Sequence, residues 1–560
     1  WAVGLSIFGT YLSSNTFIGV PGKAYGGNWN GFVFSLSLPL AAWVAVKWFV
    51  PFYRRTGEIS AYHHLEKRFG PWARTYTLTC YLLTQLARVG AILFGVALGL
   101  NALTGWSMLA IIIMAGVAVT LYTLLGGIEA VIWTDVMQSI VLLVGAVAIA
   151  VLLLVNHPGG ASEAIHLANN ADKFSVGSFA VDFTQSTFWV MLLYGIFINL
   201  NNLGIDQSFV QRYHAARDER EAKRSVWLGA LLYVPVAALF FFIGSMLFSH
   251  YEADVKNPDG IHQVREVKAE ENLVEQKNIP KKTAPITTLA TNLEHSHFGD
   301  KVLPHFIAKL PQGVAGLLIA AIFAAAMSSI DTSLNSAATV TLKDFAQRYL
   351  NYGTDEVSSM KVLRGATLVW GVLGTGVALA MIGQKSLLDT WWKVSGIFAG
   401  GMLGIFLLGL IGQKARNAAA VTGVVIGVMV IFWMTFSPGW GAHSGTVTIY
   451  RNSTMIQGYK TKFTEQIKTG DKVVIKEKTR TVKSVLSDTE MVLDKSVSEK
   501  TQLDIRLFNP RGAHQYRNLL HANMIAVVGT LTIFLVGLGV SWLRRKTDFF
   551  LSGPDDRCPR

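Results

Sequence analysis

Long, uninterrupted apolar runs constrain the fold of this 560-residue chain more than any other feature. A helix crosses the roughly 30 Å hydrocarbon core of a membrane with about 20 apolar residues. The runs are continuous rather than alternating, which excludes a transmembrane β-barrel. We therefore predict an all-α polytopic membrane protein. Its expected spans are 1–26, 29–50, 72–103, 106–124, 128–155, 188–211, 224–249, 312–340, 363–383, 391–411, 417–436 and 521–543.

Composition supports this class. Apolar residues make up 51% of the chain and charged residues only 15%, less charge than the surface of a soluble protein needs. The formal net charge of +13 fits a membrane protein whose cytoplasmic loops are rich in Lys and Arg. No nucleic-acid partner is therefore expected.

Basic loops predict the orientation of the spans. They fall on alternate sides of the predicted helices, and cytoplasmic loops carry an excess of Lys and Arg. The first span then runs from inside to outside. The basic loops are 51–74, 211–224, 343–351, 412–417 and 544–546. We expect 544–560 to be a cytoplasmic tail.

The predicted transporter core covers residues 1–436, and two long segments belong to the external side. Residues 250–311 are polar, with Lys and Glu clusters and no clear period. Residues 441–515 contain runs such as GTVTIY, DKVVIKE, TRTVKSV and EMVLDKS, separated by the turns NST, TGD and SDTE. Alternation of apolar and polar residues predicts β-strands, so we expect a small extracytoplasmic β module. The chain starts at Trp1 inside an apolar run, from which we expect a segment upstream.

Three charged residues lie inside predicted spans, where charges are costly and mark functional sites. Arg88 lies near the middle of its span, while Asp135 and Asp331 lie two and three turns from the cytoplasmic ends of theirs. The alternative for Arg88 and for Asp331 is a structural ion pair. The alternative for Asp135 is a carboxylate at the membrane interface or at a helix N-terminus.

Two polar clusters reinforce this interpretation. The first span holds GTYLSSNTFIG, and Gly, Ser and Asn weaken helix propagation, so we expect an unwound point there. Irregular backbone at that depth is tolerated where it lines a cavity. The 312–340 span holds AAAMSSIDTS, whose hydroxyls and carboxylate suit a hard cation rather than zinc or copper. Helix packing through small residues is the alternative for this second cluster.

These motifs resemble those of the sodium:solute symporters. The strings WAVGLSIFGTYLSSNTFIGVPGKAYGG, GGIEAVIWTDVMQS, VQRY and GLLIAAIFAAAMSSIDTSLNS carry the resemblance, which covers 1–436 and more loosely 521–543. Within the family the chain resembles the bacterial sialic acid symporters, because Arg88 sits where they place a carboxylate-binding arginine. The resemblance implies a LeuT-type fold, in which two inverted five-helix repeats, here 1–155 and 188–411, surround a central site.

The resemblance also implies ion and substrate sites. The common sodium site corresponds to Gly9, Leu12, Ala325, Ser328 and Ser329. A candidate second sodium site corresponds to Asp135, Ser328, Asp331 and Thr332, with Asp331 replacing the usual Ser or Thr. The implied substrate-binding residues are Ser13, Ser14, Thr16, Ser35, Arg88 and Asn199; Ser35 replaces a glutamine, and Tyr11 replaces a threonine nearby.

We therefore predict a sodium-coupled symporter that imports a small organic solute by alternating access across the plasma membrane, the inner membrane of a bacterium. A carboxylate-bearing sugar such as sialic acid is the expected solute, and a neutral sugar or another small organic acid is the alternative. Na⁺ is the expected coupling ion. We expect no organic cofactor, no enzymatic activity and a monomer in the bilayer. The alternatives from other classes are a channel and a transporter-like membrane sensor.

Overall fold

Two compact units make up the chain in the computed structural model, one of residues 1–431 with 521–560 and one of 432–520. The structure describes residues 1–560 except 58–59, 126–127, 254–298, 383–386, 413–414, 438–445, 450–452, 460–462, 476–477, 498–500, 504–505, 509–517, 519 and 552–560. Most of the predicted 250–311 loop therefore lies outside the described residues, as does the end of the predicted tail.

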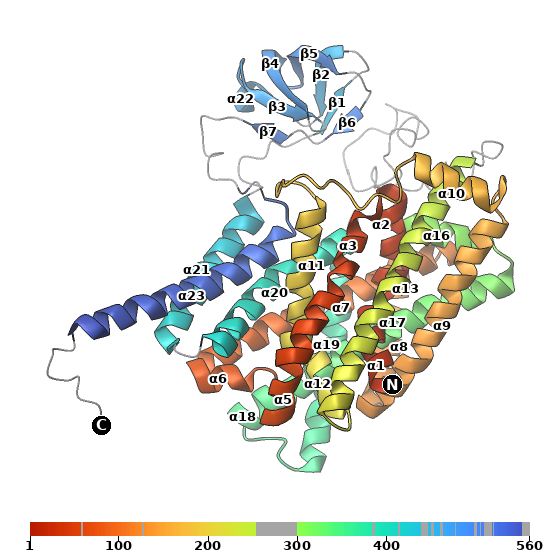
Figure 1. Ribbon diagram of the computed structural model, residues 1–560. Helices are drawn as coiled ribbons and strands as arrows, with labels where there is room; N and C mark the ends of the chain where they lie inside the picture. Colours follow the sequence, from red (N-terminus) through yellow and green to blue (C-terminus); the bar gives the residue numbers. More distant parts are fainter. Residues whose placement is uncertain are drawn as a thin grey trace. The chain divides into compact units, whose positions relative to one another are not determined.

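The first unit is helical (Figure 1). Within the described residues, ten helical segments are long and apolar enough to cross a membrane, and Ala2–Tyr11 and Met108–Leu124 are shorter apolar helices. The prediction of an all-α polytopic membrane protein is confirmed. The first repeat consists of α1 Ala2–Tyr11, η1 Asn15–Gly19, α2 Val20–Gly26, η2 Trp29–Gly31, α3 Phe32–Leu36, α4 Leu38–Val44, η3 Ala45–Phe49, α5 Val50–Thr56, α6 His63–Phe69, α7 Pro71–Thr104, α8 Met108–Leu125 and α9 Ile128–Val155.

The remaining helices complete the second repeat and the C-terminal part of this unit. Large apolar side chains of α9 and α19 are exposed, as expected where helices face lipid. These elements are α10 Gly160–Asn170, α11 Phe188–Ile205, α12 Gln207–Ala215, α13 Glu219–Ala253, α16 Gly299–Ala308, α17 Gln312–Val340, η5 Thr341–Ala346, α18 Gln347–Tyr349, α19 Glu356–Ala380, α20 Leu387–Ile411, α21 Asn417–Phe436 and α23 Met524–Leu551.

The first helix is broken where the sequence predicts it. Helix α1 ends at Tyr11, and Leu12 has extended backbone angles (φ −94°, ψ 131°) before the chain turns helical again at Asn15. The Leu12 N–H still donates to the Gly9 carbonyl at 3.0 Å. Consecutive Ser and Asn side chains compete for backbone hydrogen bonds, which weakens the helix at this point.

A second break divides the predicted span 188–211, which is a correction to the single helix expected there. Helix α11 ends at Ile205, Asp206 has extended backbone (φ −73°, ψ 119°), and α12 starts at Gln207. The Asp206 carboxylate accepts a hydrogen bond from the Ser208 N–H at 2.8 Å and so acts as the N-cap of α12. Each repeat therefore begins with a broken helix, as inverted-repeat transporters do.

Helices α1, α7, α9 and α17 meet around the breaks. Figure 1 shows α1, α9 and α17 close together, and α17 packs against both α7 and α9. Gly9 permits this approach, because a Cβ atom there would lie 2.8 Å from Ser139 Oγ on α9. Close contact between α1 and α9 therefore depends on a residue without a side chain.

The second unit contains a seven-stranded antiparallel sheet with strand order β6-β1-β2-β5-β4-β3-β7. Its core includes Val447, Ile456, Val473 and Met491. The small β module is confirmed, but the turn expected at NST is wrong in part, since β2 starts at Ser453. The strands are β1 Thr446–Ile449, β2 Ser453–Tyr459, β3 Lys472–Ile475, β4 Lys478–Ser487, β5 Glu490–Val497, β6 Thr501–Leu503 and β7 Arg506–Phe508, with the short helix α22 Phe463–Gln466.

Candidate functional site

A cavity lies between the two helix breaks. The first helix lines it on one side, α11 and α12 line it on another, and α3, α7, α13 and α20 close it. Its polar lining residues are Thr10, Tyr11, Ser13, Asn15, Thr16, Ser35, Thr84, Gln85, Arg88, Tyr194, Asn201, Asn202, Asp206, Tyr233 and Ser395. A cavity bounded by irregular backbone from both repeats is where transporters of inverted-repeat architecture hold their solutes.

Four of the six substrate residues implied by the sequence line this cavity: Ser13, Thr16, Ser35 and Arg88. The structure does not bring Ser14 and Asn199 into the lining. Ser14 Oγ donates to the Ile92 carbonyl at 2.8 Å, and Asn199 Nδ2 donates to Ser37 Oγ at 3.0 Å. Both residues were implied by the resemblance, and the helix breaks set which side of each helix faces the cavity.

Arg88 is the basic residue of the cavity lining, and its hydrogen bonds indicate what the cavity can bind. Its Nη2 donates to the Thr10 carbonyl, at the end of α1, and it forms no ion pair with a carboxylate among the described residues. A guanidinium has five N–H donors in a planar fork. Arg88 therefore retains donors for an acceptor inside the cavity.

Sequence reasoning missed Asp206, the acidic residue of this lining. Gln85 Nε2 donates to Asp206 Oδ2 at 3.3 Å, and Ser208 Oγ donates to Asp206 Oδ1 at 2.5 Å. The signal was available, since Asp followed by a polar residue starts many helices. Here it was hidden inside an apolar run read as one continuous span.

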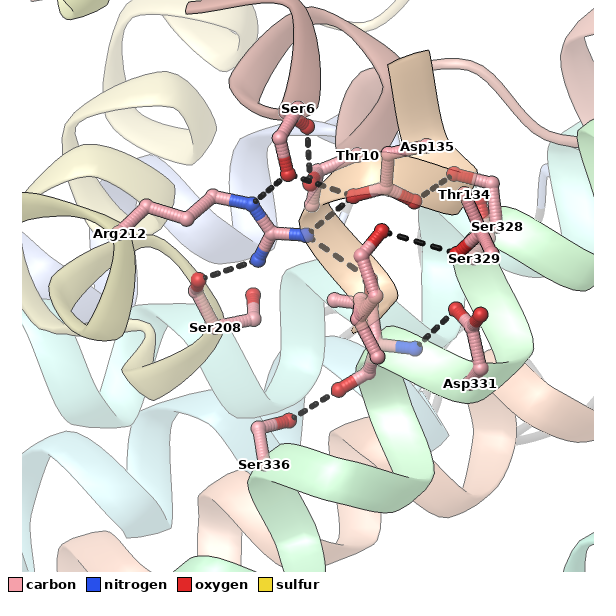
Figure 2. A network of polar contacts seen from close by, with 12 residues as sticks. Ser6, Thr10, Thr134, Asp135, Ser208, Arg212, Ser328, Ser329, Asp331 and Ser336 are labelled. Atoms are coloured by element: carbon pink, nitrogen blue, oxygen red, sulfur yellow. Dashed lines mark hydrogen bonds and ion pairs between the residues drawn. The ribbon is translucent and has the colours of Figure 1, made fainter. Parts of the chain in front are cut away.

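A second polar site lies around Asp135, which is fully buried (Figure 2). Asp135 Oδ2 accepts from Arg212 Nη2 at 2.7 Å and from Ser6 Oγ at 2.5 Å. Asp135 Oδ1 accepts from Ser328 Oγ at 2.5 Å. The acid lies inside α9 rather than at its N-terminus, and it is the partner of a buried arginine.

Arg212 is the second residue that the sequence did not single out. Its position in the basic stretch 211–224 predicted a cytoplasmic loop, whereas the structure places it in α12 with 0% exposure. Besides Asp135, it donates to Ser6 Oγ at 2.7 Å, to the Ser208 carbonyl at 2.6 Å and to Thr332 Oγ1 at 2.9 Å. One guanidinium thus joins α1, α9, α12 and α17.

The candidate sodium residues of α1 and α17 are close together. Ser329 Oγ donates to the Leu12 carbonyl at 2.8 Å, across the break of the first helix. A Cβ atom on Gly9 would lie 3.4 Å from Ser328 Oγ, so this residue also faces α17. Ala325 is buried one turn earlier on α17. The structure therefore brings hydroxyls of the second repeat to the broken helix of the first.

Asp331 lies beside this site, and one of its carboxylate oxygens has no hydrogen-bond partner among the described residues. It is 1% exposed, and its Oδ1 accepts from the adjacent Thr332 N–H at 2.6 Å. The oxygen without a partner among these residues is Oδ2. Since Arg212 balances the charge of one carboxylate, Asp135, a second ionised carboxylate here requires another cation.

The donor set suits a hard cation. Carboxylates, hydroxyls and carbonyls are hard oxygen ligands. In the described part of the chain, three or more His, Cys, Asp or Glu side chains never gather closely enough to hold a metal ion.

Comparisons with known proteins agree with this geometry. Residues 1–427 match the model of the sodium:solute symporter family. The sodium/sialic acid symporter NanT of Aliivibrio fischeri is 34% identical over 439 residues, which are 78% of this chain and 80% of that protein. Sodium-coupled monocarboxylate transporter 2 of Mus musculus is 27% identical over 77% of this chain and 65% of its own length.

A solved structure of a Na⁺-coupled sialic acid symporter, in a substrate-bound outward-open state with a novel Na⁺ site, is also similar. It is 26% identical, with a TM-score of 0.70, and the match covers 97% of this chain and 89% of that one. The LeuT-type inverted-repeat fold predicted from the sequence is confirmed by this similarity and by the two helix breaks.

Proposed function

Since the chain belongs to the sodium:solute symporter family, we propose that its solute is a carboxylate-bearing sugar of the sialic acid type. Members of this family are multi-pass transporters of the plasma membrane that couple their solute to sodium, and so is this chain. The relatives similar to this chain are named for sialic acid and for monocarboxylates, so a carboxylate is the chemistry that they share.

Arg88 is the observation that carries this proposal. Its guanidinium lines the cavity and its hydrogen bond goes to the Thr10 carbonyl. Asp206 attracts it through space, but no carboxylate of the described residues lies within 4.0 Å of it as an ion-pair partner. A cation at such depth is costly unless it is paired. A planar guanidinium binds a carboxylate through two parallel hydrogen bonds, so the solute itself supplies the missing partner. Ser13, Thr16 and Ser35 add hydroxyls for the rest of a sugar.

The first sodium ion is proposed to bind the carbonyls of Gly9, Leu12 and Ala325 and the hydroxyls of Ser328 and Ser329. The contact between Ser329 and the Leu12 carbonyl supports this assignment. A cation there would tie the broken helix of the first repeat to α17 of the second. Binding would therefore stabilise one arrangement of the repeats and shape the cavity beside the break.

A second cation is proposed to bind at Asp135, Ser328, Asp331 and Thr332. The unmatched Asp331 Oδ2 and the short contact between Ser328 and Asp135 support this site. Two Na⁺ ions and one anionic solute would move one net positive charge per cycle, to which the membrane potential contributes about 2.3 kcal/mol per 100 mV. Transport of this kind needs no covalent step and no organic cofactor. The residues proposed for the sites all belong to one chain, so we propose that a monomer suffices.

Uptake into proteoliposomes tests the proposal. An inward sodium gradient should drive accumulation of labelled sialic acid, and an equal potassium gradient should not. A neutral sugar of the same size should compete poorly. Accumulation of the neutral sugar in preference to the acid would contradict the proposed solute and leave sodium coupling intact.

A further inference from the structure

Three buried amide oxygens of cavity-lining residues have no hydrogen-bond partner among the described residues, and they belong to Asn15, Gln85 and Asn201. Asn15 Oδ1 lies beside α7, 3.3 Å from where a Cβ atom on Gly95 would be, which leaves Gln85 and Asn201 as the pair of interest. Gln85 is 1% exposed and Asn201 is 3% exposed, and both line the cavity. Gln85 Oε1 and Asn201 Oδ1 accept no hydrogen bond from the described residues. Buried polar atoms are nearly always paired, so two unpaired acceptors on residues that line one cavity indicate a missing donor.

The orientation of the Gln85 amide is fixed by its surroundings. Its Nε2 donates to Asp206 Oδ2 at 3.3 Å, and Asp206 is itself held by the Ser208 N–H and hydroxyl. Rotating the amide by half a turn would place two acceptor oxygens against each other. Gln85 Oε1 is therefore held as an acceptor that points away from Asp206.

The two acceptors come from different repeats. Gln85 lies on α7, three residues before Arg88, and residues three apart share a helix face. Asn201 lies on α11, about one turn before the break at Asp206. The cavity thus offers the donors of Arg88 together with two acceptors, one from each half of the molecule.

We propose that Gln85 and Asn201 form an acceptor subsite for hydroxyl or N–H groups of the solute whose carboxylate pairs with Arg88. This inference rests on the proposed function and narrows it. A short monocarboxylate satisfies Arg88 but leaves both amide oxygens unpaired. A carboxylic acid that also carries several hydroxyls or an acylamino group provides a partner for Arg88 and for both amide oxygens. Sites built to hydrogen-bond a solute strongly reject analogues that lack the donor.

A cycle of variants and solutes tests the subsite. Titration calorimetry measures sodium-dependent binding to wild type, Asn201→Leu and Gln85→Met. The solutes are sialic acid, propionate and a set of sialic acid analogues that each lack one hydroxyl or the acylamino group. In wild type, at least one analogue should bind roughly tenfold more weakly than sialic acid. In the variant that lacks the matching oxygen, the affinity for sialic acid should fall by the same factor, whereas the affinity for that analogue should not fall further. Propionate binding should not change.

The outcomes separate this inference from the proposed function. A purely structural role for Gln85 or Asn201 would weaken propionate and all sugar acids equally, which would overturn the subsite. The analogue series on wild type needs no variant to fold, and equal affinity for every analogue would overturn it as well. If wild type binds propionate more tightly than sialic acid, the subsite is wrong while acid symport stands. If no acid binds with sodium, the proposed function itself fails.

Discussion

Replacing Arg88 by lysine keeps the positive charge of the cavity and removes its fork of donors. Arg88 donates to the Thr10 carbonyl and has further N–H groups for the solute. A lysine ammonium is a point charge on a flexible stem, so after bonding to the Thr10 carbonyl it cannot also bind a carboxylate through two parallel hydrogen bonds.

The expected loss follows from that difference. One charge-assisted hydrogen bond contributes about 1.5–3 kcal/mol, and about 1.4 kcal/mol corresponds to a tenfold change in affinity. Arg88→Lys should therefore bind an acidic sugar roughly 10- to 100-fold more weakly than wild type, and Arg88→Ala more weakly still. Sodium binding in the absence of solute should change little, since Arg88 contacts none of the proposed sodium ligands.

Titration calorimetry of the detergent-solubilised protein measures both quantities. Sialic acid is titrated in sodium buffer and in potassium buffer, and sodium is titrated without solute. Thermal unfolding confirms that the variants are folded. Affinity of Arg88→Lys within twofold of wild type would refute the reasoning, because Arg88 would then be a structural residue that ties α7 to the end of α1.

Three further outcomes are expected. The double variant Ser328→Ala/Ser329→Ala should raise the sodium concentration for half-maximal uptake at least about tenfold, because two proposed ligands are lost; unchanged sodium dependence would contradict the site. Asp135→Asn should lower the free energy of unfolding by about 3 kcal/mol in denaturation experiments, since it leaves Arg212 buried and unpaired, and it should alter the charge moved per solute in electrophysiology. An unchanged charge-to-solute ratio would remove Asp135 from the second cation site. Deleting 445–510 and joining the ends with a short flexible linker should leave uptake per inserted protein unchanged, because this segment lies within a separate compact unit; loss of uptake would show that the unit contributes to transport.

The sequence predicted the first break but not the second, and the reason is local. The polar run from Thr10 to Thr16 is dense enough to exclude a regular apolar helix. Around Asp206 the neighbours Gly204, Ile205 and Phe209 are compatible with a continuous span, and the capping role of the acid becomes visible only when α12 changes direction.

Contacts between residues far apart in the sequence also could not be predicted from local patterns. Arg212 lies next to a run of surface charges, so composition placed it in a loop. Only the packing of α12 against α1 and α17 shows that it reaches Asp135. The resemblance to the sialic acid symporters placed Ser14 among the substrate residues, although its hydroxyl bonds to the Ile92 carbonyl of α7. Local patterns predict which residues are unusual, whereas the helix phase at a break determines what they face.

The arginine shared by four helices has a consequence for how this sequence can evolve. Ser6, Asp135 and Thr332 all accept hydrogen bonds from Arg212, so loss of any one partner leaves a buried charge less well solvated. Single replacements at these positions are therefore selected against unless another changes with them. Asp331 receives no hydrogen bond from Arg212, and replacement there disturbs none of these bonds. Among homologous transporters, the positions of Arg212 and of its three partners should therefore covary as a set. Position 331 should exchange between a carboxylate and a hydroxyl residue independently of them.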